Sequence, residues 1–422
     1  MITNDAAPKE ETPKDAQASE PETNEQAPNT PESSAPESDT TESNSTKSNA
    51  PAAKADEQAS SPAVDTALDL NYTYATAKPK IIADFRTEVK DFLVDEKLGF
   101  TPSGEGEHLY VHIKKCGENT TWIAEKLAKY FRIKPNDVSY SGKKDRHAET
   151  FQWFSIYLPK PRFTENWDDF IKQSEANIEI LESTRHHQKL RRGTHESNYF
   201  EITLRNLRSD NAEPEHTAPL DSTLKELLEQ RLTQITEQGV PNYFGEQRFG
   251  RGGSNLSLAE QWILDKVTIR NRNKRSLAMS AGRSHLFNLV LSERVSQSNW
   301  SDCLEGDVNE IFTADESEIK NRPNGVNSAT APLWGRGRNA SQHASAEIDK
   351  AVLAPYQQWL EKLEHCGLNQ ERRRLVLWPQ GLRWEFTDNN LVLKFSLASG
   401  EFATSVLREI CLLHNAVMHN SD

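Results

Sequence analysis

The densest cluster of polar side chains between two apolar stretches is the segment SGKKDRHAET, residues 141–150. Within it, Asp145 follows two lysines and precedes Arg146 and His147. An aspartate between cations stays ionised at neutral pH, so it could act as a carboxylate nucleophile or an electrostatic stabiliser, and would be a poor general acid. A solvated turn with surface ion pairs has the same composition, and composition alone favours that simpler interpretation because charge-rich loops are common.

A second segment with binding chemistry is GVPNYFGEQRFGRGGSN, residues 239–255. Its glycines would let the backbone approach a phosphate, Arg248 and Arg251 would supply paired donors, and its aromatic rings offer faces on which bases stack. A Walker A loop is excluded, because no GK[ST] follows at the required spacing. A rigid linker that packs its aromatic side chains at a domain junction explains the segment equally well.

Two stretches of the chain are strongly basic. Residues 185–208 hold six Lys and Arg against two Glu, and residues 266–283 hold six and no acid. Such clusters are typical of surfaces that bind a phosphate backbone, although a solvated cationic face has the same composition. The candidate RNA contacts from these stretches and from the glycine-rich segment are Lys189, Arg191, Arg192, Arg248, Arg251, Lys274 and Arg275.

Several other classes of site and protein are disfavoured by spacing. His186 and His187 are adjacent and HExxH is absent, so no metal site is expected, and no GxSxG elbow occurs. Four cysteines without a CxxC pair fit a reducing compartment. There is no run of about 18 apolar residues that could span a membrane, and no secretory signal or transit peptide is recognisable. We therefore expect a cytoplasmic protein without a membrane partner.

The net charge of −13 over 422 residues is unevenly distributed. Residues 1–70 hold 15 acidic and 4 basic residues, which leaves 48 acidic and 46 basic residues in the rest of the chain. The first 70 residues are mostly Ala, Pro, Ser, Thr, Asn, Gln and Glu, and cannot bury enough apolar surface to offset the entropy lost on ordering. This composition predicts a disordered acidic tail, and the nearly neutral remainder can still carry a local basic surface.

The sequence around Asp145 predicts the elements that would position it. Residues 108–115 alternate apolar and polar side chains as a half-buried strand does. Within residues 119–131, three apolar side chains four residues apart share one helical face. Ordered structure is expected from about Lys78. Further strands are predicted before and after the Asp145 loop within residues 137–158, and at residues 178–183 and 198–204.

The C-terminal half changes character twice. A helix is predicted over residues 223–238, with capping-box spacing between Thr223 and Glu226. Residues 239–374 read as mostly helical. Strand-like runs then return before a final helix. The individual predictions are helices at 284–295, 346–365 and 403–413, and strands at 373–379, 382–386 and 391–397.

The order strand-rich, helix-rich, strand-rich predicts an α+β fold in two domains. Residues 78–238 and 375–422 would form one α+β domain, and residues 239–374 would form a helical domain inserted into it.

Four segments of the chain together resemble the TruD family of tRNA pseudouridine synthases: SGKKDRHAETFQWFS, GVPNYFGEQRFGRGGSN, RNKRSLAMSAGRSHLFN and LASGEFATSVLRE. They occur in the family's order and approximate spacing, and the resemblance extends from about Lys78 to the C-terminal helix. It implies a pseudouridine-synthase catalytic domain with a mixed sheet and an inserted, mostly helical α+β TRUD domain. The implied reaction isomerises uridine to pseudouridine at position 13 of the D-arm of tRNA, with no cofactor and no metal. We expect the protein to be a monomer.

The resemblance also implies roles for individual residues. Asp145 aligns with the family's nucleophile, and Arg86 stands where a lysine is usual, which keeps the charge and changes the geometry. The chain has VKDF where PEDF is usual. The residues that would line and stack the target base are Phe92, Asn198, Phe200 and Phe402.

Two alternative functions remain open from the sequence. One is a catalytically inactive RNA-binding protein on the same scaffold. The other is a nucleosidase-like or glycosidase-like hydrolase that pairs Asp145 with a second carboxylate, for which the same loop offers only Glu149.

Overall fold

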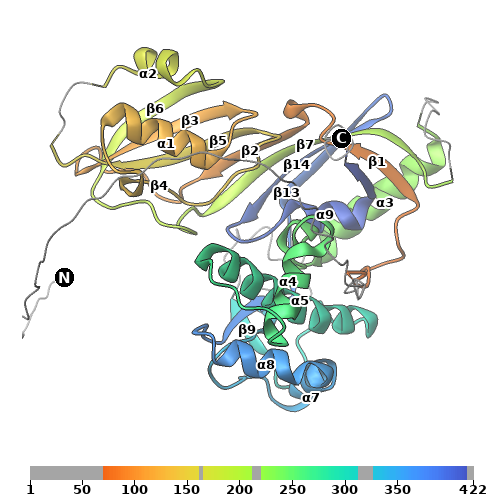
Figure 1. Cartoon of the computed structure of the whole chain (residues 1–422). Coiled ribbons are helices and arrows are strands. Elements are labelled where there is room, and N and C mark those ends of the chain that lie inside the picture. Colours follow the sequence, from red (N-terminus) through yellow and green to blue (C-terminus); the bar gives the residue numbers. More distant parts are fainter. Residues whose placement is uncertain (1–69, 161–164, 212–219, 312–326, 416–422) are drawn as a thin grey trace, which may run out of the picture. The chain divides into compact units, whose positions relative to one another are not determined.

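The computed structural model describes residues 70–160, 165–211, 220–311 and 327–415. The acidic tail predicted for residues 1–70 lies outside the described residues apart from Leu70. The described chain is an α+β structure built on one large mixed sheet, which agrees with the predicted fold class (Figure 1).

Ten strands form the large sheet, and seven of them follow the order β13-β14-β7-β2-β5-β3-β6. Strand β1 pairs with β7 and β15, and β4 pairs with β5. The pairs β2–β5 and β1–β15 are parallel, and the other pairs of this sheet are antiparallel. The strands are β1 (Ile81–Phe85), β2 (Phe92–Lys97), β3 (His108–Cys116), β4 (Val138–Tyr140), β5 (Glu149–Tyr157), β6 (Ile178–His186), β7 (Ser197–Ser209), β13 (Gln380–Thr387), β14 (Asn390–Ala398) and β15 (Leu412–Asn415).

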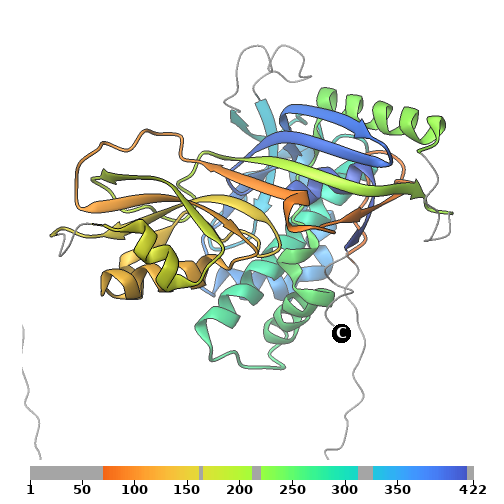
Figure 2. The same cartoon turned by 90° about the horizontal axis from the view of Figure 1, so that it is seen from above.

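One end of the sheet is covered by α1 (Thr120–Phe131) and α2 (Trp167–Ser174) (Figures 1 and 2). The alternation of β3 turns Val111 and Ile113 toward Ile123 and Leu127 of α1, and these side chains belong to one buried group that we call the α1 cluster. The side chain of Asn119 caps the helix by accepting a hydrogen bond from the Thr121 N–H at 2.8 Å. The helix predicted for residues 119–131 is thus confirmed.

The other end of the sheet is covered by α3 (Ser222–Gln238) and α9 (Ala403–Ile410), whose apolar faces form the α9 cluster with β1, β7 and β14. The predicted capping box of α3 is wrong: the helix begins after Asp221, and that residue's side chain makes no capping hydrogen bond. The predicted helix at 403–413 is also too long. After Ile410 the helix ends and the chain forms β15, because the backbone there can form hydrogen bonds with the edge of β1. A longer helix could not make those hydrogen bonds.

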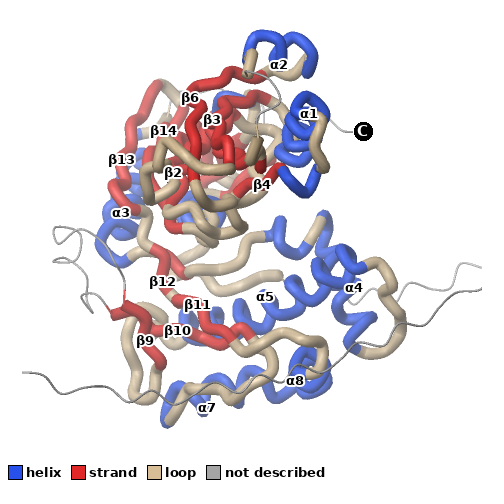
Figure 3. The backbone as a smooth tube through the Cα atoms, turned by 90° about the vertical axis from the view of Figure 1, so that its left-hand side faces the viewer, coloured by secondary structure: helices blue, strands red, loops and turns tan. Residues whose placement is uncertain are grey.

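The chain between α3 and β13 contains helices and two small sheets, grouped apart from the large sheet (Figure 3). Three strands pair in the order β11-β10-β9, so the segment is less helical than predicted. The predicted helix at 346–365 is interrupted at Pro355, which cannot donate a backbone hydrogen bond. The elements are α4 (Ser254–Ile263), α5 (Arg272–Ser296), α7 (His343–Leu353), α8 (Gln357–Glu364), β8 (Val240–Pro241), β9 (Val308–Ile311), β10 (Asn327–Leu333), β11 (Glu371–Arg374) and β12 (Val376–Leu377).

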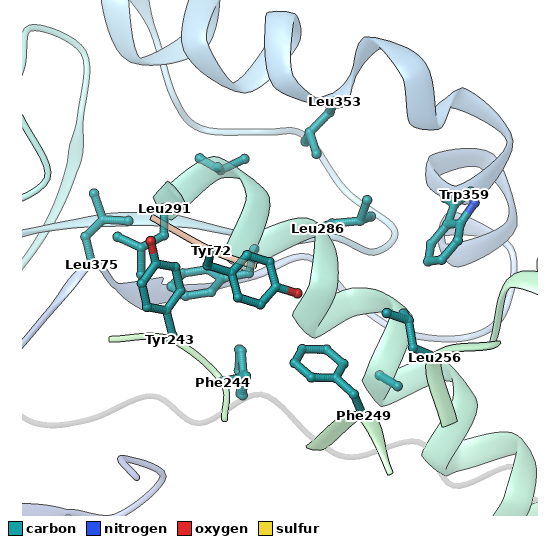
Figure 4. Packing of buried hydrophobic residues seen from close by; sticks show 14 of the residues in the cluster. Tyr72, Tyr243, Phe244, Phe249, Leu256, Leu286, Leu291, Leu353, Trp359 and Leu375 are labelled. Atoms are coloured by element: carbon teal, nitrogen blue, oxygen red, sulfur yellow. The ribbon is translucent and has the colours of Figure 1, made fainter. Parts of the chain in front are cut away.

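The apolar side chains of this segment form a third group, the α5 cluster, and a residue from the start of the described chain joins it (Figure 4). Tyr72 is 8% exposed, its ring stacks on Tyr243 at 5.3 Å between centroids, and its hydroxyl bonds to His285 Nδ1 at 2.8 Å. The expectation that order begins near Lys78 is therefore wrong by several residues, because one aromatic side chain after a polar tail leaves no periodic pattern in the sequence.

Candidate active site

Asp145 lies at the edge of the sheet where the parallel strands β2 and β5 begin. The two strands pair in the register Leu93↔Glu149, so the segments that precede them reach the same edge. There Arg86 Nη2 lies 2.7 Å from Asp145 Oδ2, and the two side chains are 14% and 15% exposed. The pair is therefore largely shielded from water, yet one edge of the carboxylate remains accessible.

Arg86 is held on aromatic side chains. Its backbone has φ 60°, in the left-handed region, and its guanidinium lies 4.7 Å from the Phe85 ring centroid and 4.5 Å from the Phe92 centroid. Burial lowers the pKa of Arg86 while the Asp145 charge opposes that shift. The short guanidinium–carboxylate contact therefore fixes Oδ2 in place.

The loop that carries Asp145 is tied to its surroundings by side chains of α1 and β5. The Lys144 N–H donates to Thr120 Oγ1 at 3.0 Å, and the Thr120 hydroxyl donates to Gln152 Oε1 at 2.9 Å. Gln152 Nε2 in turn donates to the Gly142 carbonyl at 2.6 Å. The His147 N–H donates to Asp145 Oδ1 at 3.1 Å, so each carboxylate oxygen has a fixed partner.

The Lys144 side chain points beneath the loop into a set of buried polar side chains, which we call the Lys144 group. Its Nζ lies 2.7 Å from Glu96 Oε2 and donates to Asn198 Oδ1 at 2.5 Å, and Glu96 and Asn198 are cross-strand partners on β2 and β7. The Lys144 and Glu96 side chains are 7% and 0% exposed. Burial raises the pKa of Glu96 and the Lys144 charge opposes that shift, so the lysine stabilises the ionised form of this buried carboxylate.

His195 also belongs to the Lys144 group and connects it to the C-terminal part of the chain. Asn198 Nδ2 donates to His195 Nε2 at 3.0 Å, and Nδ1 of the same imidazole lies 3.5 Å from Ser399 Oγ. Burial, helped by the Lys144 charge, lowers the pKa of His195 to about 4. The imidazole is therefore neutral at neutral pH, with Nε2 as acceptor and the proton on Nδ1.

A second buried cation near Asp145 is Lys115, which is 0% exposed and donates to the Glu118 carbonyl at 2.8 Å. Burial lowers the pKa of Lys115 to about 8, while the Asp145 charge opposes that shift. The positive field at the carboxylate thus comes from Arg86 and Lys115 as well as from residues of its own loop.

Three charged or polar residues of the site are absent from the predictions made from the sequence: Glu96, Lys115 and His195. A signal for two of them was present in strand periodicity: Glu96 continues the buried alternation of Phe92 and Val94, and Lys115 continues that of β3. A charged residue in the buried phase of a strand indicates a partner or a function. His195 lies in a loop, where no periodicity applies.

The four residues predicted to line the target base do not form one group. Phe92 and Phe200 are 6% and 7% exposed and their ring centroids are 6.1 Å apart, with Arg86 over Phe92. Asn198 joins the Lys144 group. Phe402 immediately precedes α9 and contacts Phe244 at 5.9 Å between centroids, in a different set of neighbours.

The basic loop before β7 lies against the Asp145 loop. The Gly193 N–H donates to the Ser141 carbonyl at 2.8 Å, and Arg191 and Arg192 beside it are exposed. Lys189 is exposed as well and donates to the Asn136 carbonyl at 2.7 Å.

The other predicted RNA contacts lie in the segment of α4 and α5. Arg251, Lys274 and Arg275 are exposed. Arg248 is partly buried: its guanidinium lies 5.1 Å from the Phe244 centroid and donates to Ser280 Oγ at 2.8 Å. Its position is therefore set by protein contacts.

No set of three or more His, Cys, Asp or Glu side chains in the described parts of the chain is placed to hold a metal ion. Likewise, no helix there is long and apolar enough to cross a membrane. The arrangement around Asp145 offers a carboxylate whose two oxygens are both held, with the cations Arg86 and Lys115 beside it. Such a group can attack an electron-poor carbon or take a proton.

Comparison with known proteins matches this chain to one family over most of its length. The family model for tRNA pseudouridine synthase D (TruD) matches residues 68–268 and 266–410. A tRNA pseudouridine synthase D from Cellvibrio japonicus is 44% identical over 355 residues, which cover 83% of this chain and 95% of that protein. One from Aeromonas hydrophila is 43% identical over 346 residues, which cover 80% and 93%.

A crystal structure from Methanosarcina mazei, named after the same family, has the same fold. It superposes with a TM-score of 0.57 at 20% identity and covers 80% of this chain and 95% of that one. The family match and the two relatives at 44% and 43% identity lead to one conclusion: the chain belongs to the tRNA pseudouridine synthase D (TruD) family.

Proposed function

We propose that this protein isomerises uridine to pseudouridine in tRNA, with Asp145 as its nucleophile. The observation that carries the proposal is the Arg86–Asp145 pair of 2.7 Å, with the carboxylate 15% exposed at the start of two parallel strands. The relatives named tRNA pseudouridine synthase D support the reaction and the substrate class. By similarity to the family, the target is position 13 of the D-arm.

The reaction balances without an oxidant, a reductant or a second substrate. The bond between N1 of uracil and C1′ of ribose breaks, the detached base rotates, and C5 forms a new bond to C1′. C5 loses its proton and N1 gains one. The Asp145 carboxylate serves either by attacking C1′ or by taking a ribose proton, and both routes need it ionised and held as Arg86 holds it.

The surrounding residues have supporting roles in this proposal. Arg86 fixes one carboxylate oxygen, Asn198 and the rings of Phe92 and Phe200 bound the site on the sheet side, and Phe402 meets the base from the α9 side. A uridine in a stacked arm cannot reach a recessed carboxylate, so the nucleotide must be flipped out of its stack.

The RNA backbone would meet the basic side chains near the site. Arg191 and Arg192 are favourably placed, because their loop bonds to the Asp145 loop at Ser141. Lys189 extends this surface on the same loop. Arg248, Arg251, Lys274 and Arg275 are proposed as contacts from the segment 239–374, which we propose is a TRUD domain inserted between residues 78–238 and 375–422.

We also propose that the protein is a cytoplasmic monomer. The four cysteines are all unpaired thiols in the described chain, which suits a reducing compartment.

The proposal is tested with Asp145→Asn, which keeps the side-chain shape and removes the charge. In tRNA labelled with tritium at C5 of uridine, we expect tritium release to fall more than about a thousandfold while tRNA affinity stays within about threefold. Asp388→Asn, in the exposed turn between β13 and β14, is the matched control and should behave as wild type.

Each alternative gives a different result in the same assay. Unchanged release from Asp145→Asn would place the chemistry elsewhere. Wild-type protein that binds tRNA and releases no tritium would be an inactive RNA-binding protein. Free uracil among the products would identify a hydrolase.

A further inference from the structure

The glycine-rich segment 239–255 reaches the loop that carries Phe402, through the contact between the Phe244 and Phe402 rings. This loop, residues 399–402, connects β14 to α9 and is contacted from two sides. On one side the Ser399 N–H donates to the Glu196 carbonyl at 3.0 Å, and His195 Nδ1 faces Ser399 Oγ at 3.5 Å. On the other side lies Arg373, from β11.

Arg373 connects this loop to the segment 239–255 through hydrogen bonds. Its Nη1 donates to the Gly400 carbonyl at 2.8 Å. Its Nε donates to the Asn242 carbonyl at 3.2 Å, and its Nη2 donates to Asn242 Oδ1 at 2.5 Å. A single planar guanidinium thus spans two segments that are more than 150 residues apart in sequence, which a lysine could not do with the same geometry.

The same guanidinium lies against the rings of both segments. It is 4.2 Å from the Phe244 centroid and 5.6 Å from the Phe402 centroid, and the two rings are themselves 5.9 Å apart. Arg248 lies 5.1 Å and 5.6 Å from the same two centroids. Phe402 is therefore set by two cations and one ring, and none of the three comes from its own loop.

The side to which Arg373 ties the loop is rigid. Asn242 is 2% exposed and its N–H donates to the Leu375 carbonyl at 2.8 Å. Phe244 exchanges two hydrogen bonds of 2.9 Å with the side chain of Asn288, which is 0% exposed. These contacts give Arg373 a fixed platform.

The charge on Arg373 is not taken up by a carboxylate. Its hydrogen bonds go to the Asn242 and Gly400 carbonyls and to Asn242 Oδ1, which are neutral oxygens, and no ion pair joins it to another described residue. Burial lowers the pKa of Arg373 to about 9, against the influence of Glu401, so the group stays charged at neutral pH. The cation–ring contacts therefore persist under working conditions.

We propose that Arg373 is a positioning residue that ties the Gly400 carbonyl and the Phe402 ring to Asn242 and Phe244, and so fixes Phe402 for the target base. This inference rests on the proposed function, because it gives Phe402 its role in the reaction. It also assigns a task to the NYFGEQRFG motif: the motif forms the platform against which a ring of the active site is set.

The test compares Arg373→Gln and Arg373→Lys with wild type, using single-turnover tritium release at saturating enzyme together with tRNA binding. A displaced ring should slow turnover about 10–100-fold for Arg373→Gln while tRNA affinity changes less than about threefold. Arg373→Lys keeps the charge over the rings but cannot make all the hydrogen bonds of the guanidinium to the two segments. It should therefore turn over faster than Arg373→Gln and more slowly than wild type. Arg383→Gln, an exposed arginine on β13, controls for the lost charge.

A double-mutant cycle separates positioning from direct RNA contact. If Arg373 acts through Phe402, the double variant Arg373→Gln with Phe402→Ala is no slower than Phe402→Ala alone. The inference would be overturned if the rate losses of the two single variants multiply in the double variant. It would also be overturned if Arg373→Gln lowers the slope of log tRNA affinity against log salt concentration by about one. Either result would make Arg373 a phosphate contact. An effect of Arg373→Gln no larger than that of Arg383→Gln would overturn it as well.

Failure of this inference can be distinguished from failure of the proposed function. If wild-type protein forms no pseudouridine, the function itself fails. If Phe402→Ala turns over like wild type, the role of Phe402 fails and the inference fails with it. If Phe402→Ala is slow and the cycle is multiplicative, the function stands and only the positioning role is lost.

Discussion

Lys144 lies between a buried carboxylate and a buried amide, one residue before Asp145. Its ammonium lies 2.7 Å from Glu96, whose side chain has no exposed surface. A charge in such a position depends on its partner, because removing one member leaves the other desolvated and unpaired. The conformation of the Asp145 loop is therefore coupled to an ion pair underneath the sheet edge.

Lys144→Met should destabilise the protein by about 3–5 kcal/mol, since Glu96 would be left buried without its cation. The double variant Lys144→Met with Glu96→Gln removes both charges and should recover most of that loss. Urea denaturation at pH 7.5 measures the free energies of unfolding. A double variant no more stable than Lys144→Met alone would contradict the pairing.

The neutral His195 should make stability depend on pH in the acidic range. Its folded pKa of about 4 is below the ordinary value of 6.5, so the unfolded state binds the proton first as pH falls. The contribution of His195 to the free energy of unfolding is fully present above about pH 6.5. It is lost progressively as the pH falls toward 4, and the loss is roughly 3 kcal/mol at most.

Comparing wild type with His195→Gln between pH 7.5 and pH 4.5 isolates this contribution, because other groups titrate in both proteins. The variant should show the shallower loss of stability on acidification. Parallel curves for the two proteins would show that His195 has the same pKa in the folded and unfolded states, contrary to this prediction.

At the scale of elements, the first turn of α1 holds the Asp145 loop through one hydroxyl. Thr120 is 1% exposed and its Oγ1 accepts from the Lys144 N–H while donating to Gln152. The next residue, Thr121, is less buried, and its hydroxyl has only a 3.4 Å contact to the Tyr140 hydroxyl. The two threonines thus form a natural pair for comparison.

Thr120→Val keeps the shape and leaves two polar groups unsatisfied, so we expect a loss of about 1–3 kcal/mol and slower turnover from a less ordered loop. Thr121→Val should cost less than about 1 kcal/mol and leave turnover unchanged. Chemical denaturation and single-turnover kinetics measure the two effects. Equal behaviour of the two variants would show that the hydroxyl of Thr120 does not order the loop.

The sequence predicted the elements that have strong periodicity and local end signals. The helix at residues 119–131 and the strands around Asp145 follow from side-chain spacing, and the structure agrees. β15 could not be predicted from side-chain spacing, since its conformation depends on the free edge of β1, a partner more than 300 residues away. The strands β9 and β10 were missed for the same reason: short strands are defined by their pairing.

The candidate site could be predicted only in part for a similar physical reason. Asp145 and Arg86 were expected to be functional, and the structure places them in contact. Tertiary packing decides that the Lys144 side chain pairs with a buried carboxylate instead of with Asp145. It also decides that the neighbours of Phe402 come from residues 244–248 and from β11. Spacing along the chain carries no information on either.

At the scale of the whole molecule, the first described residues tie the α5 cluster to α9. Tyr72 packs in the α5 cluster, and its carbonyl accepts from Arg408 Nη2 of α9 at 2.7 Å. The Ala75 N–H donates to Glu409 Oε2 at 3.0 Å. Residues 70–77 therefore belong to the packed structure, even though they directly follow the polar tail.

A protein that starts at Lys78 should be less stable than one that starts at Leu70 by about 3–5 kcal/mol, the usual cost of losing a buried aromatic side chain. Urea denaturation of the two truncated proteins gives the difference. In the full chain, Tyr72→Phe should cost only about 1 kcal/mol, because the ring stays and the hydrogen bond to His285 is lost. Equal stability of the two truncated proteins would show that this segment contributes no net packing.

The parallel pairing of β1 with β15 has a consequence for how the protein is made. Of the described strands of the large sheet, β1 is the first along the chain and β15 is the last, so this pair cannot form before the residues up to Asn415 have been synthesised. Contacts between such distant parts form slowly, whereas the middle of the chain can collapse around α5 during synthesis. A nascent chain stalled before Leu412 would display an uncovered edge of β1, and would be a natural client for chaperones.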